Sequence, residues 1–509
     1  MTARLLLIPE KRAVINRAYS RSYHGGHTSM RSNRNGGRAM LLVALTLVTA
    51  WGASVPVPRI TGPIPSTATP GDPSLNYPFF STKHFVDKHG YIEEEFFVEG
   101  LAVEYSGEAD QTATIAPGGP YPYKTRAIVR RPKSAGKFNG TVILEWTNSA
   151  AGFGIDNDWY WSREHLMQRG FAHIGVIVEP NGIHSMLGLK QWNPRRYGSL
   201  DLTANGRFTN TQTGFELSFS IFSQMAQAAK NPAGGALLGN LKVRNVVATG
   251  HSRSSARLHN YYNRVHPLEK VVDGFVFHAQ GGLVRTDIPT PAWKLLSETD
   301  VILHQAVSRQ PDSQHFRAWE VAGASHADWD LARIVSELEV RDHLPPRPEG
   351  PVCEPVDGSR VPSHLVQDAV YDWMKLWIER GTAPPHAPPI LISSLGKAEG
   401  GPNDAARQSV AVRDALGNAL GGIRLAQFAV PTAANTGWNA TPVPGCRNRG
   451  SFRPFDANTI ARLYPTRAKY VAEVNRITDE NLKAGYITKE GAAQTRKDAA
   501  QWKAPAGNQ

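Results

Sequence analysis

The sequence predicts an α/β fold in which a mostly parallel central sheet carries helices on both faces. Two observations predict it: apolar β-rich runs alternate with helix-compatible runs, and several of the β-rich runs end in turns of small residues. In such sheets, functional groups lie on loops at the carboxyl ends of the strands. Polar residues that directly follow a predicted strand are therefore the first candidates for a site.

The 509 residues divide into four segments of different composition. They are a leader with a signal peptide (1–54), an extended lead-in rich in Pro, Thr, Ser and Gly (55–78), the core (79–395) and a C-terminal extension (396–509). The extension holds glycine-rich turns and polar helical stretches at 459–476 and 478–485. We expect it to pack on the core as a cap or a lateral addition.

The leader has the order of segments that is typical of a secretory signal. Three arginines precede the apolar run 39–50, and the small residues 52–54 follow it. The run is shorter than the ~20 residues that a membrane-spanning helix needs. We therefore expect an exported protein, periplasmic or extracellular, without a stable membrane span.

The formal charge of +12 does not indicate a nucleic-acid partner. Residues 1–53 carry eight Lys or Arg against one acid, so the leader holds most of the surplus and +5 remains for the rest. That is an ordinary surface, and no basic stretch is interleaved with aromatic residues. We expect a small-molecule partner, while the oligomeric state stays open.

Within the core, strands and helices are expected in alternation. The expected strands are 96–105, 124–131, 141–146, 171–178, the run that enters 250–254, 270–278, 293–297 and 316–322. The expected helices are 159–169, 215–230, 256–266 and 365–380. The last of these is amphipathic and is followed by Gly381, so we expect its Trp373 and Trp377 to pack in the core rather than line a ligand site.

The most informative motif is Gly-x-Ser-x-Ser at residues 250–254. It follows a β-rich run and precedes a helix-compatible one. In a nucleophile elbow, small residues on both sides of a serine let the chain turn sharply and leave the hydroxyl exposed at a helix N-terminus. Ser252 is the predicted nucleophile.

A base and an acid follow in the chain order of a Ser-acid-His triad. His326 lies in a small-residue turn after the strand 316–322, and Asp300 lies after the strand 293–297. A histidine near its own pKa can take the serine proton, and the acid fixes the imidazole tautomer. Glu298 is the alternative acid.

Other histidines and acids compete with this assignment. His278, at the end of its own strand, competes for the role of base, whereas His251 adjoins the nucleophile and should point elsewhere. Glu145 suits either a supporting acid of the site or a structural carboxylate. Glu164-His165 lacks the second histidine of a His-Glu-x-x-His zinc motif, and we expect no metal and no cofactor.

These motifs together resemble the α/β-hydrolase family whose members carry a Gly-x-Ser-x-Ser/Thr elbow, a Glu-Trp strand end and a Val-Ala-Gly-x-x-His-Ala-Asp turn. The matching segments are 139–148, 250–254, 297–300, 321–328 and 417–424, and the resemblance spans about residues 75–490. It implies an α/β-hydrolase fold and a serine triad. It does not indicate the substrate.

The oxyanion hole is expected to use two backbone amides. One is that of Arg253, at the helix N-terminus, and the other lies near Thr147 or Asn148, in the loop after the strand 141–146. Arg253 is also a departure from the family elbow, which often has Gln at this position. Its side chain is expected to border the site.

The chain holds two cysteines, Cys353 and Cys446. In an exported protein they are expected to form one disulfide, and two separate buried thiols are the alternative.

The motifs predict a secreted serine hydrolase that cleaves carboxylic esters through an acyl-serine, with short acyl chains preferred. An amidase or peptidase on the same triad is the near alternative. A non-catalytic binding protein on a hydrolase scaffold is the alternative from another class.

Overall fold

The computed structural model describes residues 54–208, 217–231, 235–346, 358–397, 408–439 and 444–503. The predicted leader and Cys353 lie outside these ranges. The described residues from 54 onward belong to one compact unit.

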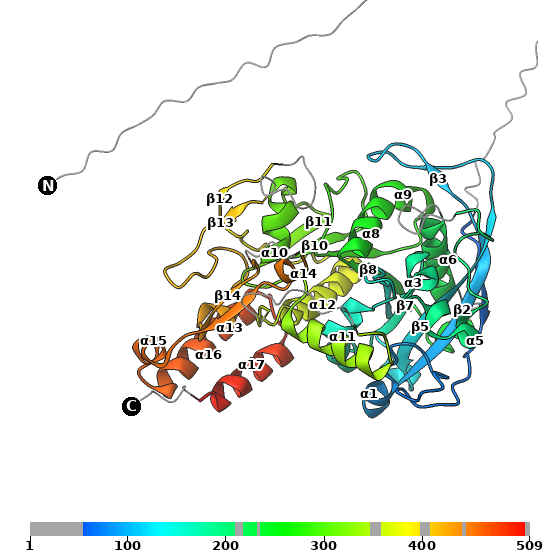
Figure 1. Ribbon diagram of the computed structural model, residues 1–509. Helices are drawn as coiled ribbons and strands as arrows, with labels where there is room; N and C mark the ends of the chain where they lie inside the picture. Colours follow the sequence, from blue (N-terminus) through cyan, green and yellow to red (C-terminus); the bar gives the residue numbers. More distant parts are fainter. Residues whose placement is uncertain are drawn as a thin grey trace, which may run out of the picture. The chain divides into compact units, whose positions relative to one another are not determined.

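A nine-stranded sheet forms the centre of the described chain (Figure 1). In spatial order its strands are β1 (Arg59–Thr61), β2 (Tyr91–Ala102), β5 (Tyr121–Pro132), β7 (Ala172–Val176), β6 (Thr141–Trp146), β8 (Asn245–His251), β9 (Gly274–His278), β10 (Ala292–Ser297) and β11 (Phe316–Val321). From β7 to β11 all neighbours are parallel, whereas β1, β2 and β5 add an antiparallel edge. The predicted mostly parallel sheet is confirmed.

Helices cover both faces of this sheet. The helices before and between the later strands are α1 (Lys83–Lys88), α2 (Asn157–Gln168), α3 (Asn181–His184), α4 (Leu189–Trp192), α5 (Pro194–Tyr197), α6 (Ser218–Lys230), α7 (Gly235–Leu238), α8 (Arg253–Arg264), α9 (His266–Glu269) and α10 (Glu298–Asp300). Those after β11 are α11 (Trp329–Arg341) and α12 (His364–Arg380).

Strand β9 shows how the two faces are filled. The rings of Phe275 and Phe277 lie 5.0 and 5.7 Å from that of Tyr262 in α8. A Cβ added to Gly274 would instead lie 2.7 Å from the sulfur of Met374 in α12. Because alternate residues of a strand face opposite sides, α8 and α12 lie on opposite faces of the sheet.

The predicted helix at 365–380 is present as α12, and its expected end is confirmed. Gly381 has a φ of 65° and donates its amide to the Trp377 carbonyl, as a glycine after a helix often does. Trp377 is buried, and Trp373 donates its ring N–H to the Gly485 carbonyl at 2.9 Å. Neither tryptophan lines the cavity described below.

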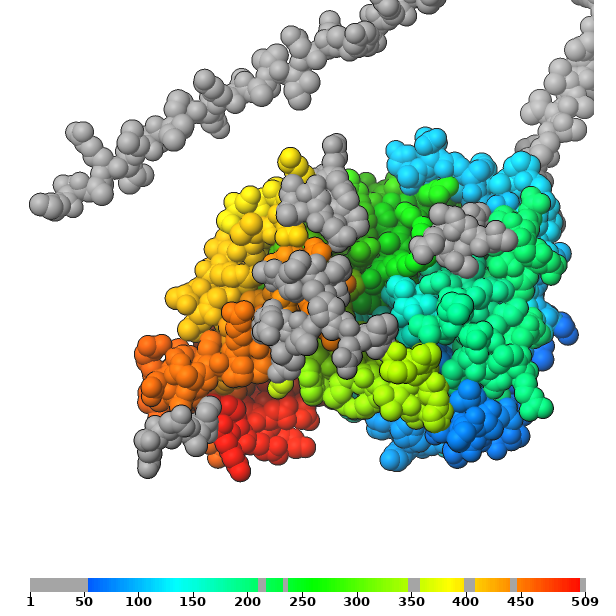
Figure 2. All heavy atoms as spheres, viewed as in Figure 1, coloured from blue at the N-terminus to red at the C-terminus, as the bar shows by residue number. Residues whose placement is uncertain are grey.

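The C-terminal extension consists of short strands and helices. They are β13 (Val410–Ala411), α13 (Ala426–Ala429), β14 (Ala433–Thr436), α14 (Pro444–Arg447), β15 (Ser451–Pro454), α15 (Ala457–Leu463), α16 (Arg467–Lys483) and α17 (Lys489–Gln501). Strand β12 (Ile392–Ser394), just before the extension, pairs with β13. Earlier in the chain, β3 (Tyr105–Ser106) and β4 (Thr114–Ile115) form a separate antiparallel pair. In Figure 2 the orange and red surfaces of the extension adjoin the yellow-green surface of α11. Its residue Ile423 exchanges main-chain hydrogen bonds with Glu320 and Ala322, at the C-terminal end of β11.

The expected helix at 459–476 is wrong in its bounds. It is two helices, because Pro465 has no amide to donate and Tyr464 before it adopts a non-helical ψ of 82°. The second helix, α16, begins after Thr466, whose side chain accepts from the Lys469 amide, and ends at Lys483, so it includes most of the stretch at 478–485 that was expected as a separate helix.

Candidate active site

Ser252 lies in a sharp turn between β8 and α8, which Figure 1 shows in green. Its φ of 60° and ψ of −121° place a non-glycine residue in a strained region of the backbone map. A Cβ on Gly250 would lie 3.2 Å from that of Ser254, so the close approach of the two arms favours the small residues found there. The elbow predicted at Gly-x-Ser-x-Ser is present.

A chain of hydrogen bonds runs from Ser252 through His326 to Asp300. The distance from Ser252 Oγ to His326 Nε2 is 2.8 Å, and that from His326 Nδ1 to Asp300 Oδ1 is 2.6 Å. The carboxylate fixes the tautomer that carries its proton on Nδ1, which leaves Nε2 to accept the serine proton. The geometry therefore brings together the three residues proposed from sequence as nucleophile, base and acid.

Asp300 is held by the start of its own short helix. Its second oxygen, Oδ2, accepts from the amide of Ser297 at 2.8 Å and from the Ser297 hydroxyl at 2.6 Å. The Ser297 side chain in turn accepts from the Asp300 amide, so the pair forms a capping box at α10. This cap aims the other oxygen, Oδ1, at His326.

Glu298, the alternative acid, has other partners. Its Oε2 accepts from the Gly323 amide at 2.8 Å, and its Oε1 accepts from Arg413 at 2.6 Å. Both contacts join α10 to segments that come later in the chain. The contact with Arg413 could not be predicted from the sequence, because 115 residues separate the partners.

The loop after β6 does not offer the expected amides. The Thr147 amide donates to Val176 O at 3.1 Å, and the Asn148 amide donates to Ile155 O at 3.0 Å. Both are therefore engaged in main-chain bonds, and the expected use of the Asn148 amide in an oxyanion hole does not agree with this pairing. In the described residues, the amides of this loop without such an acceptor include those of Ser149 and Ala151.

The side chain of Arg253 lies beside an acid that the sequence analysis did not single out. Its Nε is 3.1 Å from Oε2 of Glu179, which lies just beyond β7 and is buried. Burial raises the pKa of Glu179, while Arg253 and then Arg257 lower it. Arg253 does not line the cavity that contains Ser252, contrary to the expectation that it borders the site.

His251 and His278 lie beneath the site. His251 Nδ1 accepts from the Asn157 amide group at 2.9 Å, and its Nε2 donates to the His326 carbonyl at 2.9 Å. His278 Nδ1 lies 2.6 Å from Asp158 Oδ1. His278 therefore pairs with its own buried acid, and it is His326 Nε2 that accepts the hydrogen bond from Ser252 Oγ.

Glu145 has a structural role at the start of α2. Its oxygens accept from the amides of Asp158 and Trp159 at 2.9 and 3.0 Å, where a helix has amides without intrahelical partners. His173 Nε2 lies 2.9 Å from the same carboxylate. Of the two readings left open by the sequence, these contacts favour the structural carboxylate.

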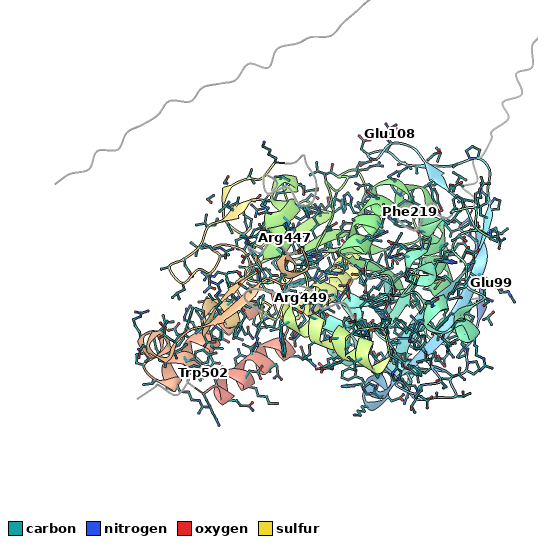
Figure 3. The ribbon with its side chains drawn as sticks, in the orientation of Figure 1. Glu99, Glu108, Phe219, Arg447, Arg449 and Trp502 are labelled. Atoms are coloured by element: carbon teal, nitrogen blue, oxygen red, sulfur yellow. The ribbon has the colours of Figure 1, made fainter. Side chains whose placement is uncertain are left out.

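Ser252 and His326 line a cavity of about 540 Å³. One wall is an apolar stripe of α11, with Leu331, Val335 and Val340, and the far end is formed by Asn448 and Arg449. Arg449, labelled in Figure 3, also lines an adjoining cavity of about 610 Å³ along the same helix. A cavity of this size accommodates a small organic molecule.

The family of this chain follows from a comparison with family models. The model described as alpha/beta hydrolase domain matches residues 60–497, which is most of the chain. The chain belongs to this alpha/beta hydrolase family. No curated protein matches it.

Three solved structures are among those to which the chain is similar. The CE15 glucuronoyl esterase from Teredinibacter turnerae is 10% identical, with a TM-score of 0.28, over 58% of this chain and 79% of that one. Est1E from Butyrivibrio proteoclasticus is 10% identical, with a TM-score of 0.27, over 48% and 96%. The CE15 glucuronoyl esterase from Caldicellulosiruptor kristjansonii is 15% identical, with a TM-score of 0.25, over 56% and 80%.

Two structural absences hold for the described residues. Within those ranges, no group of three or more His, Cys, Asp and Glu side chains could hold a metal ion. No helix there combines the length and the apolar character that a membrane crossing requires. Cys446 is buried, and its predicted partner Cys353 lies outside the described ranges.

Proposed function

We propose that this hydrolase is an exported serine esterase that cleaves carboxylic esters through an acyl-serine intermediate. The observation that supports the proposal most strongly is the hydrogen-bond chain Ser252–His326–Asp300, at 2.8 and 2.6 Å. The strained backbone of Ser252 supports it further, since such strain concentrates at functional sites. The export of the protein rests on the leader sequence alone.

In the first half-reaction, Ser252 Oγ attacks the ester carbonyl carbon as His326 Nε2 takes its proton. The imidazolium then gives this proton to the leaving alkoxide, and the alcohol departs. In the second half-reaction, His326 activates a water that attacks the acyl-serine and releases the carboxylic acid. Asp300 holds the Nδ1 proton of His326 and stabilises the imidazolium throughout.

The negative charge on the carbonyl oxygen requires two donors. We assign one to the Arg253 amide at the start of α8, where the helix dipole also favours an anion. The second donor is not the Asn148 amide, because that amide donates to the Ile155 carbonyl. We assign the second donor to another backbone amide of the same loop, that of Ser149 or Ala151. Loss of one such donor typically costs about 10²–10³ in rate.

An ester panel separates this proposal from its alternatives. p-Nitrophenyl esters of two to twelve acyl carbons and matched anilides are assayed with the wild type and with Ser252→Ala. The proposal expects ester turnover that Ser252→Ala abolishes, with anilides near background because an amide leaving group needs well-timed protonation. Equal kcat/KM for ester and anilide would indicate an amidase or peptidase, and no turnover would indicate a binding protein.

The preference for short acyl chains stays a prediction. An Arg253 side chain at the entrance would favour it by narrowing the access, but that side chain lies against Glu179. The apolar wall of α11 gives the cavity room for chains longer than acetyl. A maximum at long acyl chains in the same panel would contradict the preference without affecting the assignment of Ser252.

A further inference from the structure

A second cavity lies over strands β10 and β11, on the face of the sheet that carries α8. Its volume is about 210 Å³. It shares no lining residue with the cavity that contains Ser252. Lys294 of β10 lines it, and this lysine is only 2% exposed.

The acids around this cavity already have partners of their own. Glu320 accepts two hydrogen bonds from Arg309, at 2.7 and 2.6 Å, and another from the Ile390 amide at 2.7 Å. Asp312 accepts from the Ala318 amide at 3.1 Å and lies 2.6 Å from His386. Neither acid accepts a hydrogen bond from Lys294, although the charge of Glu320 still acts on the lysine and raises its pKa.

Among the described residues, Lys294 has no hydrogen-bonding or ion-pair partner for its ammonium group. Its one near aromatic partner in these ranges is Phe316, with the ring centroid 6.0 Å from Nζ. An ammonium group has three donors, and burying it without an acceptor is costly. The cavity therefore has one unmatched positive charge at its buried wall.

Besides these charged groups, the cavity is lined by apolar residues and by the polar side chains of Gln305, Ser308 and Gln310. Its apolar lining residues are Leu296, Phe316, Ala318, Ala387 and Pro389. A ligand that fits this combination has one negative charge to meet the ammonium and a short hydrocarbon body to cover the apolar wall. A volume of about 210 Å³ limits that body to a few carbon atoms.

We propose that this cavity is a binding site for a short-chain monocarboxylate, held through its carboxylate by the Lys294 ammonium. The site is separate from the Ser252 cavity, and the proposal does not depend on the assignment of Ser252. Lys294 is three residues before Ser297, which caps the helix that carries Asp300, so the ligand would bind on the strand that leads to the acid.

The ionisation of the lysine agrees with this geometry. Burial lowers the pKa of Lys294 to about 8, and Glu320 opposes the shift. A bound carboxylate favours the charged amine, so it must raise this pKa again. At neutral pH the amine is still mainly protonated and able to hold an anion.

The test is the melting temperature of the full-length protein in acetate, propionate and butyrate, with ionic strength held constant by sodium chloride. We expect a saturable rise in the wild type and in the control Lys469→Met, whose lysine is exposed on α16. Lys294→Met, which keeps the chain length and removes the charge, should show no such rise. An equal rise in Lys294→Met would overturn the proposal.

A second measurement covers the case in which Lys294→Met fails to fold. The Lys294 signal of the ¹³C-methylated wild type is titrated with pH, with and without propionate. An upward shift of its pKa in propionate supports the site, and an unchanged pKa rejects it. Inorganic phosphate is the comparison anion: if it stabilises as well as propionate and chain length has no effect, the site is for inorganic oxyanions and the carboxylate assignment is wrong.

Discussion

Asp300 and Glu298 are two residues apart, yet their carboxylates have different hydrogen-bond partners and different roles. The capping box of α10 turns Asp300 toward His326, whereas Glu298 joins α10 to Gly323 and Arg413. The sequence offered both as the acid, since both follow the same strand. Which one meets the histidine depends on side-chain partners that no spacing rule supplies.

This difference predicts opposite effects for the two amide variants. Asp300→Asn should lower kcat by about 10⁴-fold, because an amide no longer fixes the tautomer of His326. Glu298→Gln should leave most of kcat and lower the free energy of unfolding by about 1–3 kcal/mol, because it disturbs a buried hydrogen-bonded pair. Steady-state kinetics and urea denaturation measure both. The reverse pattern in kcat would assign the role of acid to Glu298.

Lys294 makes a second residue-level prediction, for pH. Its folded pKa of about 8 lies below its ordinary value of 10.5, so the unfolded chain binds more protons than the folded chain between these values. Stability should therefore rise with pH across that window, and the lysine is unfavourable below it. Lys294→Met should flatten the rise and raise the melting temperature at pH 7 in carboxylate-free buffer. Parallel profiles for the wild type and the variant would contradict the buried amine.

Among the elements, those with local signals were predictable. A hydrophobic period or a stop signal within a few residues marks each of them. They are the strand before the elbow, the strands that end before Asp300 and His326, and α12 with Gly381 after it. The engagement of the Asn148 amide was not predictable, because it needs a bridge to Ile155 that closes only in the folded loop. The break between α15 and α16 could have been predicted from Pro465, but the expected helix at 459–476 continued across this proline.

The segment after β14 is where the extension meets the acid and the histidine. A Cβ on Gly437 would lie 2.3 Å from Ala324 O and 2.6 Å from the Cβ of Glu298. Gly437→Ala should therefore displace α10 or the histidine turn, lowering both kcat and the unfolding free energy, the latter by about 1–3 kcal/mol. Gly136→Ala is the control, since its nearest neighbour would be 3.9 Å away. Equal behaviour of the two variants would show that the extension does not hold the site.

At the scale of the whole molecule, the fold class was predictable because alternation of strands and helices is a property of the entire core. The contribution of the extension was not, because it depends on contacts such as that between Arg413 and Glu298, far apart in sequence. Export and the cysteine pair stay predictions from sequence, and we propose both.

The pairing of Cys353 with Cys446 would tie the segment after α11 to the extension. Non-reducing peptide mapping of the exported protein should recover one peptide that contains both cysteines, because exported proteins meet an oxidising environment. Reduction should lower the melting temperature, since closing a loop of this length restricts the unfolded chain. Recovery of two freely alkylated thiols from native protein would refute the pairing.

The central claim is that Ser252 is the nucleophile, and covalent labelling tests it most directly. The protein is treated with a fluorophosphonate, digested and mapped by mass spectrometry, beside Ser252→Ala and His326→Ala. The account predicts a single adduct on Ser252, none in Ser252→Ala, and strongly slowed labelling in His326→Ala, because the hydroxyl then lacks its base. An adduct on Ser254 or Ser255, or labelling that survives Ser252→Ala, would contradict it.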